Sequence, residues 1–224
     1  MKPITFTLIA LLAFSHLFAQ DKGEMQYLFS NKDVSISGFG APIVEFSAYD
    51  GNFAVFNGGG GAAIFDNKFF IGGYGMGMTT QSNYPNVYSE NGNLQADHLQ
   101  VSFGHGGLWT GYNFMPNYPV HFVVSLKAGG GAASLINTEF DFEDYEQYFD
   151  YVGVIKPQVD VEMNLIRWFK ISFGAGYRYV MGIGDATYFN AEGEEVRYFN
   201  KNDFNAPYGS ITFLFGGFGP KKKN

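Results

Sequence analysis

VGVIKPQVDVEMNL, residues 152–165, carries a polar or charged side chain at every second position from Lys156 to Asn164. The intervening positions are mostly apolar, among them Ile155, Val159 and Val161. A period of two is typical of a β-strand with two unlike faces. A soluble sheet would turn the apolar face to a core and the charged face to water, whereas a transmembrane barrel reverses this arrangement. Features of the rest of the chain are needed to choose between a soluble sheet and a transmembrane barrel.

The N-terminus, MKPITFTLIALLAFSHLFAQ, has an early Lys2, an apolar run over residues 4–14 and the small residue Ala19. This order is typical of a secretory signal peptide cut after Ala19 or Gln20, and the run is shorter than the ~20 residues of a spanning helix. The chain has no cysteine, which excludes a cysteine-linked lipid anchor and disulfides. We therefore predict four segments: a signal peptide (1–19), a periplasmic segment (20–33), a barrel (34–218) and a basic tail (219–224).

Composition limits the possible classes further. The chain has 30 glycines and 19% aromatic residues, and this much glycine disfavours helices. Removing residues 1–19 deletes one lysine, so the formal charge of −7 becomes −8. An acidic chain is a poor nucleic-acid binder, and we predict no nucleic-acid partner. No second apolar run approaches the length of a spanning helix, so a membrane location would require a barrel.

Short and long connections alternate along the chain. Tight turns are predicted at 50–52, 66–67, 115–118 and 167–168, and the connections at 81–98, 135–150 and 182–206 are long. This alternation favours an all-β fold, an eight-stranded antiparallel up-and-down transmembrane barrel with short periplasmic turns and three long outer loops. A soluble sandwich or lipocalin-like barrel is the alternative. The eight strands are expected near 34–48, 53–65, 68–80, 99–114, 120–134, 151–165, 169–181 and 207–218.

In such a barrel the charged strand positions face the interior. A turn centred on Arg167 would place Lys156 opposite Arg178, and two neighbouring cations are unfavourable. We expect Glu45 and Asp160 to neutralise them, and we expect a bulge at Pro157 because proline cannot donate to the ladder. The same register pairs Asn164 with Lys170 and Glu162 with Ser172. An eight-stranded barrel is barely wide enough for its side chains, so this network would plug the interior. The predicted network comprises Glu45, Lys127, Lys156, Asp160, Glu162, Lys170 and Arg178.

Aromatic residues are expected to mark the two membrane interfaces. Trp109 and Trp168 are predicted anchors on the periplasmic side. A second girdle near the outer ends of the strands would contain Tyr49, Tyr151, Tyr177, Tyr179 and Tyr208.

Four glycine-rich and aromatic-rich stretches carry a resemblance to a known group: GGGGAAIFDNKFFIGGYGMGMTT (58–80), GGLWTGYNF (106–114), SLKAGGGAASL (125–135) and NLIRWFKISFGAGYRYV (164–180). Together they resemble the small outer-membrane β-barrel proteins of Bacteroidetes-type bacteria. The resemblance implies location and architecture, with no defined activity. The last strand, YGSITFLFGGF (208–218), looks like the insertion signal of such barrels but is followed by GPKKKN instead of ending on an aromatic residue.

An enzymatic role has one candidate position, His98 beside Asp97, with Ser102 four residues further on. Four residues along a strand span about 13 Å, because the rise is ~3.3 Å per residue, which is too far for a hydrogen bond. The H-x-S spacing of barrel deacylases is absent, and His105 and His121 are interpreted as structural or interfacial. We predict no catalytic residues, cofactor or metal, and a lipid-modifying enzyme remains an alternative.

The outer loops are the remaining candidate for function. The segment NTEFDFEDYEQYFDY (137–151) interleaves acidic and aromatic residues without a basic one. It is interpreted as a solvated acidic surface beside lipopolysaccharide, or as an interaction surface; a calcium site at Asp141, Glu143 and Asp144 is weaker. We predict a structural or surface-interaction protein whose partners are outer-membrane lipids, lipopolysaccharide and the barrel-assembly machinery. The alternative is narrow porin-like transport of ions or small hydrophobic molecules. The predicted interaction residues are Glu139, Asp141, Glu143, Asp144, Tyr145 and Tyr148.

Overall fold

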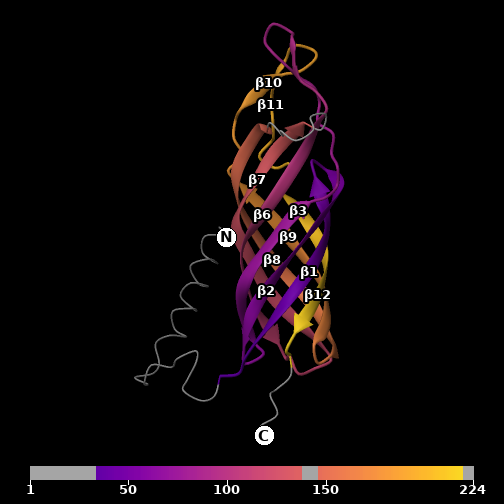
Figure 1. The fold of residues 1–224 in the computed structure, drawn as a ribbon, viewed down its shortest axis with the longest axis vertical. Helices are drawn as coiled ribbons and strands as arrows, with labels where there is room; N and C mark the ends of the chain where they lie inside the picture. Colours follow the sequence, from indigo (N-terminus) through magenta and orange to yellow (C-terminus); the bar gives the residue numbers. More distant parts are fainter. Residues whose placement is uncertain (1–33, 138–145, 219–224) are drawn as a thin grey trace, which may run out of the picture. The chain divides into compact units, whose positions relative to one another are not determined.

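Eight long strands close into an antiparallel barrel in the computed structural model, which describes residues 34–137 and 146–218 (Figure 1). Each strand pairs with its neighbours in the up-and-down order, and β1 closes the ring against β12. All eight predicted strands are confirmed. Their bounds are β1 (Ile36–Tyr49), β2 (Asn52–Phe65), β3 (Phe69–Met78), β6 (Leu99–Phe114), β7 (Val120–Asn137), β8 (Glu146–Ile166), β9 (Phe169–Met181) and β12 (Ala206–Gly216).

Several predicted segments lie outside the described residues. These are the signal peptide (1–19), the periplasmic segment (20–33) and the basic tail (219–224). Within the described part of the chain, no helix has the length and apolar character needed to cross a membrane.

The tight turns explain how the strands reverse. Asp50 and Gly51 both have positive φ, as do Asp66 and Asn67, and a turn with positive φ at both central residues matches the twist of the flanking strands. The connections at 66–68, 115–119 and 167–168 lie at one end of the barrel, and the long connections lie at the other. The predicted long connections at 81–98 and 182–206 are confirmed, whereas the one expected over 135–150 is shorter, because β7 extends to Asn137 and β8 begins at Glu146.

Two of the long connections contain strands that were not predicted. The segments β4 (Val87–Tyr88), β5 (Leu94–Ala96), β10 (Thr187–Phe189) and β11 (Glu195–Arg197) form a second sheet in the order β11-β10-β4-β5. One pair, Phe189 with Tyr88, joins the two connections. Figure 1 shows β10 and β11 beyond the end of the barrel. We call this sheet and its connections the outer module.

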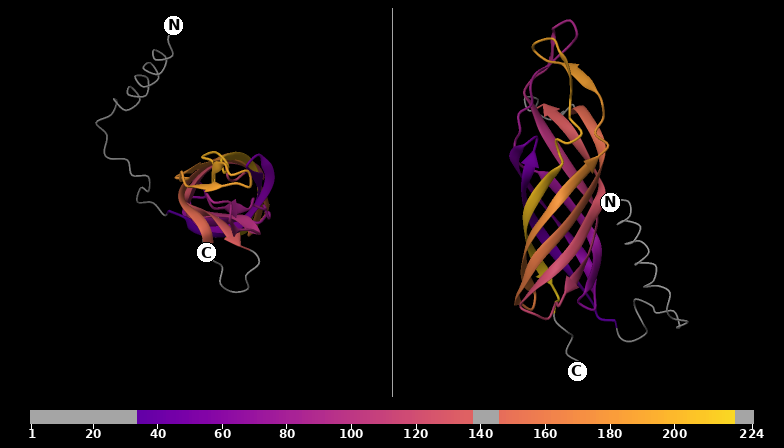
Figure 2. Two further views of the ribbon diagram at one scale, coloured as in Figure 1. Left: turned by 90° about the horizontal axis from the view of Figure 1, so that it is seen from above. Right: turned by 180° about the vertical axis from the view of Figure 1, so that it is seen from behind.

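The pleat of the barrel separates two chemistries. On β7, Phe122, Val124 and Leu126 are exposed on the outside, whereas Ser125 and Lys127 are buried inside. Figure 2, seen from above, shows the strands as a closed ring around that interior. An apolar exterior around a polar interior is the reverse of a soluble sheet and is the arrangement of a transmembrane barrel.

The predicted bulge at Pro157 is wrong. The β8–β9 ladder pairs Ile155 with Tyr179 and Gln158 with Gly176, which is one continuous register. Lys156 and Pro157 pair with β7 but are skipped in the β9 ladder, so the missing N–H is accommodated without an extra residue. The register shifts instead between Asn164 and Ile166, beside the turn. The predicted pairs of Asn164 with Lys170 and Glu162 with Ser172 are confirmed.

Candidate functional site

The barrel interior is the candidate site because it buries seven charged side chains, and burying a charge is costly unless it is paired and hydrogen-bonded. The interior has three levels: aromatic rings below the outer module, a polar middle, and a mixed polar and apolar region towards the short turns. The seven side chains are Glu45, Lys127, Lys156, Asp160, Glu162, Lys170 and Arg178.

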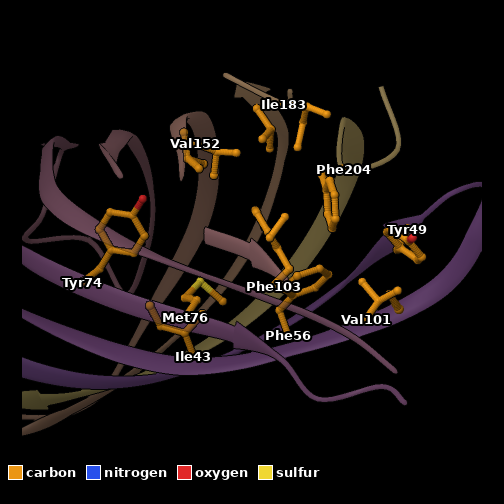
Figure 3. Packing of buried hydrophobic residues seen from close by; sticks show 14 of the residues in the cluster. Ile43, Tyr49, Phe56, Tyr74, Met76, Val101, Phe103, Val152, Ile183 and Phe204 are labelled. Atoms are coloured by element: carbon orange, nitrogen blue, oxygen red, sulfur yellow. The ribbon is translucent and has the colours of Figure 1, made fainter. Parts of the chain in front are cut away.

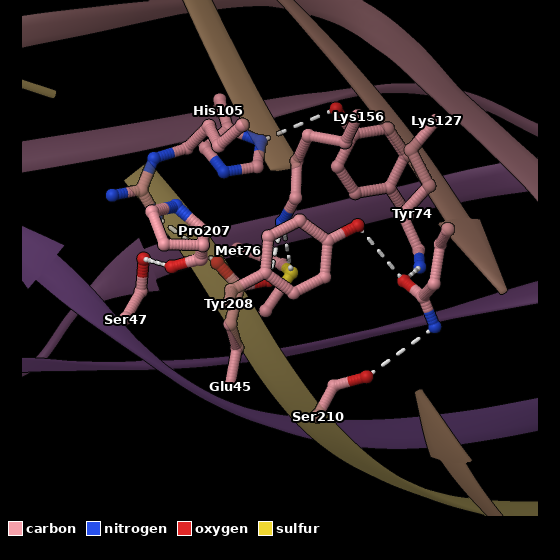
Figure 4. A network of polar contacts seen from close by, with 12 residues as sticks. Glu45, Ser47, Tyr74, Met76, His105, Lys127, Lys156, Pro207, Tyr208 and Ser210 are labelled. Carbon is pink, nitrogen blue, oxygen red and sulfur yellow. Dashed lines mark hydrogen bonds and ion pairs between the residues drawn. The ribbon is translucent and has the colours of Figure 1, made fainter. Parts of the chain in front are cut away.

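Glu45 lies between two of the buried cations. One carboxylate oxygen accepts a bond of 2.5 Å from Lys156 Nζ (Figure 4). The other accepts a bond of 3.0 Å from Arg178 Nη1. Arg178 also donates to the backbone carbonyls of Phe204 and Ala48, at 2.9 and 2.8 Å. The guanidinium therefore ties the segment before β12 and the end of β1 to the charged cluster.

Asp160 does not contact the two cations that it was expected to neutralise. Its Oδ1 accepts bonds from Gln158 Nε2 at 2.6 Å and Ser172 Oγ at 3.0 Å. The Gln158 carbonyl oxygen in turn accepts from Lys127 Nζ at 2.7 Å and Tyr208 O–H at 3.1 Å. Gln158 therefore bridges Lys127 and Asp160: it lies two residues from Asp160 on β8 and diagonally across the β7–β8 ladder from Lys127, whose direct partner is Lys156.

A third cluster lies towards the short turns. Glu162 Oε1 accepts a bond of 2.6 Å from Lys170 Nζ and lies 3.1 Å from His121 Nε2. The other ring nitrogen of His121 lies 3.3 Å from the backbone oxygen of Tyr118. His121 was interpreted as structural or interfacial, without a partner. Its place in the interior could have been read from β7, where Val123, Ser125 and Lys127 continue the same alternation.

Trp109 is not a lipid-facing anchor. It is 4% exposed and packs edge-on against Phe39 and Phe70 inside the barrel, with ring centroids at 5.4 and 5.6 Å. Lys127 Nζ lies 4.7 Å from its ring centroid. Trp109 points inwards because it is an odd-numbered residue of β6, and the odd-numbered residues of this strand, such as Phe103, are the buried ones.

The other aromatic residues that were predicted at the membrane interfaces lie partly inside and partly outside the barrel. Tyr49 and Tyr208 are buried and belong to the interior, so their expected place in an outer girdle is wrong. Tyr151 and Tyr179 are exposed on the outside. Trp168 is 58% exposed beside the β8–β9 turn, and its role as an interface anchor stays a prediction.

Aromatic rings fill the interior below the outer module. Phe204 stacks on Phe103 with centroids 4.6 Å apart, and both are buried with Phe56 (Figure 3). Further out, Tyr84 O–H donates to the backbone oxygen of Tyr198 at 2.5 Å. Burial raises the pKa of both tyrosines above the ordinary value. The outer module is thus anchored in the mouth of the barrel.

Most of the predicted interaction residues, and with them the calcium alternative, lie outside the described residues. Tyr148 is described: its ring stacks on Tyr198 at 4.3 Å, and its hydroxyl donates to Asp150 at 2.8 Å. Within the described ranges, no group of three or more His, Cys, Asp or Glu side chains is placed to hold a metal ion. Those outside are Glu139, Asp141, Glu143, Asp144 and Tyr145.

A small cavity lies at the third level of the interior. Its volume is about 20 Å³, and its polar wall includes Asp160, Glu162, Lys170 and Ser172. Aromatic and aliphatic side chains, including Trp109, form the opposite wall. A space of this size holds about one water molecule and no organic ligand.

No protein-family model and no curated protein matches the chain. Among solved structures, Neisserial surface protein A matches with a TM-score of 0.50 and 9% identity, over 84% of this chain and 100% of that one. Ail, the attachment invasion locus protein of Yersinia pestis, matches with a TM-score of 0.44 and 12% identity, over 81% and 97%. The protease OmpT of Escherichia coli has a TM-score of 0.31 and 10% identity, over 85% and 97%.

At these identities the likeness shows the fold alone. The chain has the eight-stranded barrel fold of small outer-membrane proteins, which confirms the expected resemblance at the level of architecture. The bacterial group stays a prediction.

Proposed function

We propose that the chain is an integral outer-membrane barrel with a structural or surface-interaction role, exerted by its outer loops above a plugged interior. The observation that carries this proposal is the outer module. Two connections far apart in the sequence pair through Phe189 and Tyr88 and share an aromatic core with the barrel mouth. Binding residues are found disproportionately on loops that a rigid scaffold positions, and the outer module is such a set of loops.

The expected partners follow from the surface. The apolar exterior fits outer-membrane lipids, and the chain would reach them through a cleaved signal peptide and the barrel-assembly machinery. The outer module is mainly acidic, with Asp185, Glu192, Glu194 and Glu195 exposed against Arg197 and Lys201. In the proposed role this acidic surface faces lipopolysaccharide and is available to an external partner.

We extend the interaction surface to Glu139, Asp141, Glu143, Asp144, Tyr145 and Tyr148. The stacking of Tyr148 on Tyr198 supports this extension, because it joins the start of β8 to the outer module. The acidic segment directly precedes that contact in the sequence.

Epitope insertion on intact cells tests the orientation that this role requires. A tag after Ala191, in the exposed β10–β11 turn, should bind antibody on intact cells. A matched tag after Asn117, in the short β6–β7 turn, should bind only after permeabilisation. Labelling of the Asn117 tag on intact cells would overturn the orientation and the proposed surface role.

Fractionation tests the location separately. The protein should be extracted from the outer-membrane fraction by detergent and should migrate faster on a gel when unheated than when heated, because a folded barrel is compact. A soluble periplasmic protein without a heat shift would contradict the proposal.

A further inference from the structure

Two hydrogen-bonded groups follow each other along the inner face of β8. The middle group contains Asp160, Gln158 and Ser172, and the lower group contains Glu162 with Lys170. Asp160 and Glu162 are two residues apart on one face, about 7 Å along the strand. Across the described ranges, no hydrogen bond between protein atoms joins the two groups.

Each of these carboxylates uses only one oxygen. Asp160 Oδ1 accepts both of that residue's bonds, and Glu162 Oε1 accepts from Lys170 and lies against His121. Among described residues, Asp160 Oδ2 and Glu162 Oε2 have no hydrogen-bond donor. The Lys170 ammonium has three N–H groups and one carboxylate acceptor. These charged groups lie at the cavity wall and retain hydrogen-bonding capacity, so a further partner is expected there.

The cavity of about 20 Å³ is placed to hold that partner, since Asp160, Ser172, Glu162 and Lys170 all contribute to its wall. We propose that it binds one water molecule, which donates to Asp160 and Glu162 and accepts from Lys170. Three partners is the usual number for a buried water. The bridge would join the two groups into one network running from Lys127 to His121.

The charges around the cavity favour water over an ion. Two carboxylates repel an anion, and the Lys170 ammonium at the same wall opposes a second cation. The volume also leaves no room for the remaining ligands of a cation. Water alone can donate to the carboxylates and accept from the ammonium.

Crystals of the detergent-solubilised protein grown in sodium chloride and in rubidium chloride test the identity of the occupant. The expected result is a density peak in contact with Asp160 and Glu162 that carries no rubidium anomalous signal. A rubidium signal there would replace the water with a cation, and an empty cavity in well-defined density would overturn the site altogether.

Solution NMR tests the same site independently, because the chain has only two tryptophans. Trp109 lines the cavity and Trp168 is exposed, and Trp168→Phe assigns the two indole signals. Trp109 should show a cross-peak to a long-lived water. Val123→Leu enlarges a side chain that lines the cavity and should abolish the cross-peak by displacing the water. Val124→Leu enlarges a side chain on the lipid face and should retain the cross-peak. A missing cross-peak in the wild type, or one that survives Val123→Leu, would count against the proposal.

Discussion

The carboxylate of Glu45 is the only acceptor within ion-pair distance of both Lys156 and Arg178 among the described residues. All three side chains are at most 1% exposed. A buried ion pair adds little net stability over an apolar replacement, but removing one partner leaves an uncompensated buried charge. At Glu45 that loss would strand two cations at once.

Glu45→Gln should therefore lower the free energy of unfolding by about 3–5 kcal/mol. Urea unfolding in detergent micelles, followed by tryptophan fluorescence, measures the change. The matched control is Glu195→Gln, whose exposed carboxylate accepts from Thr187 at 2.6 Å and should cost under about 1 kcal/mol. Equal effects of the two substitutions would contradict the account of the interior.

Residue by residue, the alternation of polar and apolar side chains was enough to predict which positions of β8 and β9 face inwards. Trp109 was predicted to face lipid from its depth along β6 alone, whereas its odd-numbered position places it on the inward face of that strand. The alternation also could not show which inward groups meet, because Arg178 on β9 reaches Glu45 on β1, and Gln158 on β8 accepts from Tyr208 on β12, although these strands are not neighbours in the barrel. Contacts of this kind depend on barrel closure and on side-chain length.

The strand β3 shows why glycine is distributed on both faces of the barrel. A Cβ atom added at the inward Gly72 would lie 1.9 Å from the backbone oxygen of Gly61 and 2.5 Å from Ala62 Cα. A Cβ atom at the outward Gly75 would have nothing within 4 Å. The two glycines are three residues apart, and only Gly72 is required by close packing of neighbouring backbones.

Gly72→Ala should prevent β2 and β3 from pairing normally and should abolish the heat-dependent gel shift. Gly75→Ala should fold and gain roughly 0.5–1 kcal/mol, because alanine loses less conformational freedom than glycine within a strand. Gel mobility and urea unfolding measure both outcomes. A folded, equally stable Gly72→Ala protein would show that the β2–β3 contact is looser than the structure indicates.

Among the elements, the eight barrel strands could be predicted because each is long enough to display a period of two between turn residues. The strands β4, β5, β10 and β11 could not, since two or three residues show no period. Their sheet depends on the pairing of Phe189 with Tyr88, which joins connections distant in the chain. Tertiary contact, and not local pattern, creates the outer module.

The hydrogen bond from Tyr84 to the backbone of Tyr198 should stabilise the closed outer module by about 1 kcal/mol. Tyr84→Phe removes the donor and should make protease cleavage of the outer module roughly fivefold faster, because cleavage follows the population of the open form. Limited proteolysis of the micelle-bound protein measures the rate. Tyr88→Phe keeps the Tyr84 bond and is the control; equal acceleration by both would deny Tyr84 a special role.

The whole interior is closed at three successive levels. Phe103 and Phe204 stack below the outer module, Glu45 holds Lys156 and Arg178 beneath them, and the lowest cavity has room for about one water. A hydrated ion needs a continuous aqueous path, and these contacts between described side chains interrupt the interior at each level. The predicted plug thus has a physical basis in packing as well as in charge, and porin-like transport would require its rearrangement.

The absence of cysteine from the chain allows a direct measurement of that closure. Ser125→Cys places a thiol at an interior position that is 4% exposed, and Ala191→Cys places one in the exposed outer turn. A small water-soluble thiol reagent should label Ala191→Cys within its normal reaction time and leave Ser125→Cys unlabelled until the barrel is unfolded. Because both variants carry a single thiol in the same chain, the ratio of their labelling rates reports access to the interior and not reagent quality.

The wild-type protein should likewise show no stable current steps in planar bilayers. Rapid labelling of Ser125→Cys together with regular current steps would mean that the charged interior is a water-filled path, and the protein would then be a transporter and not a closed support for its outer module.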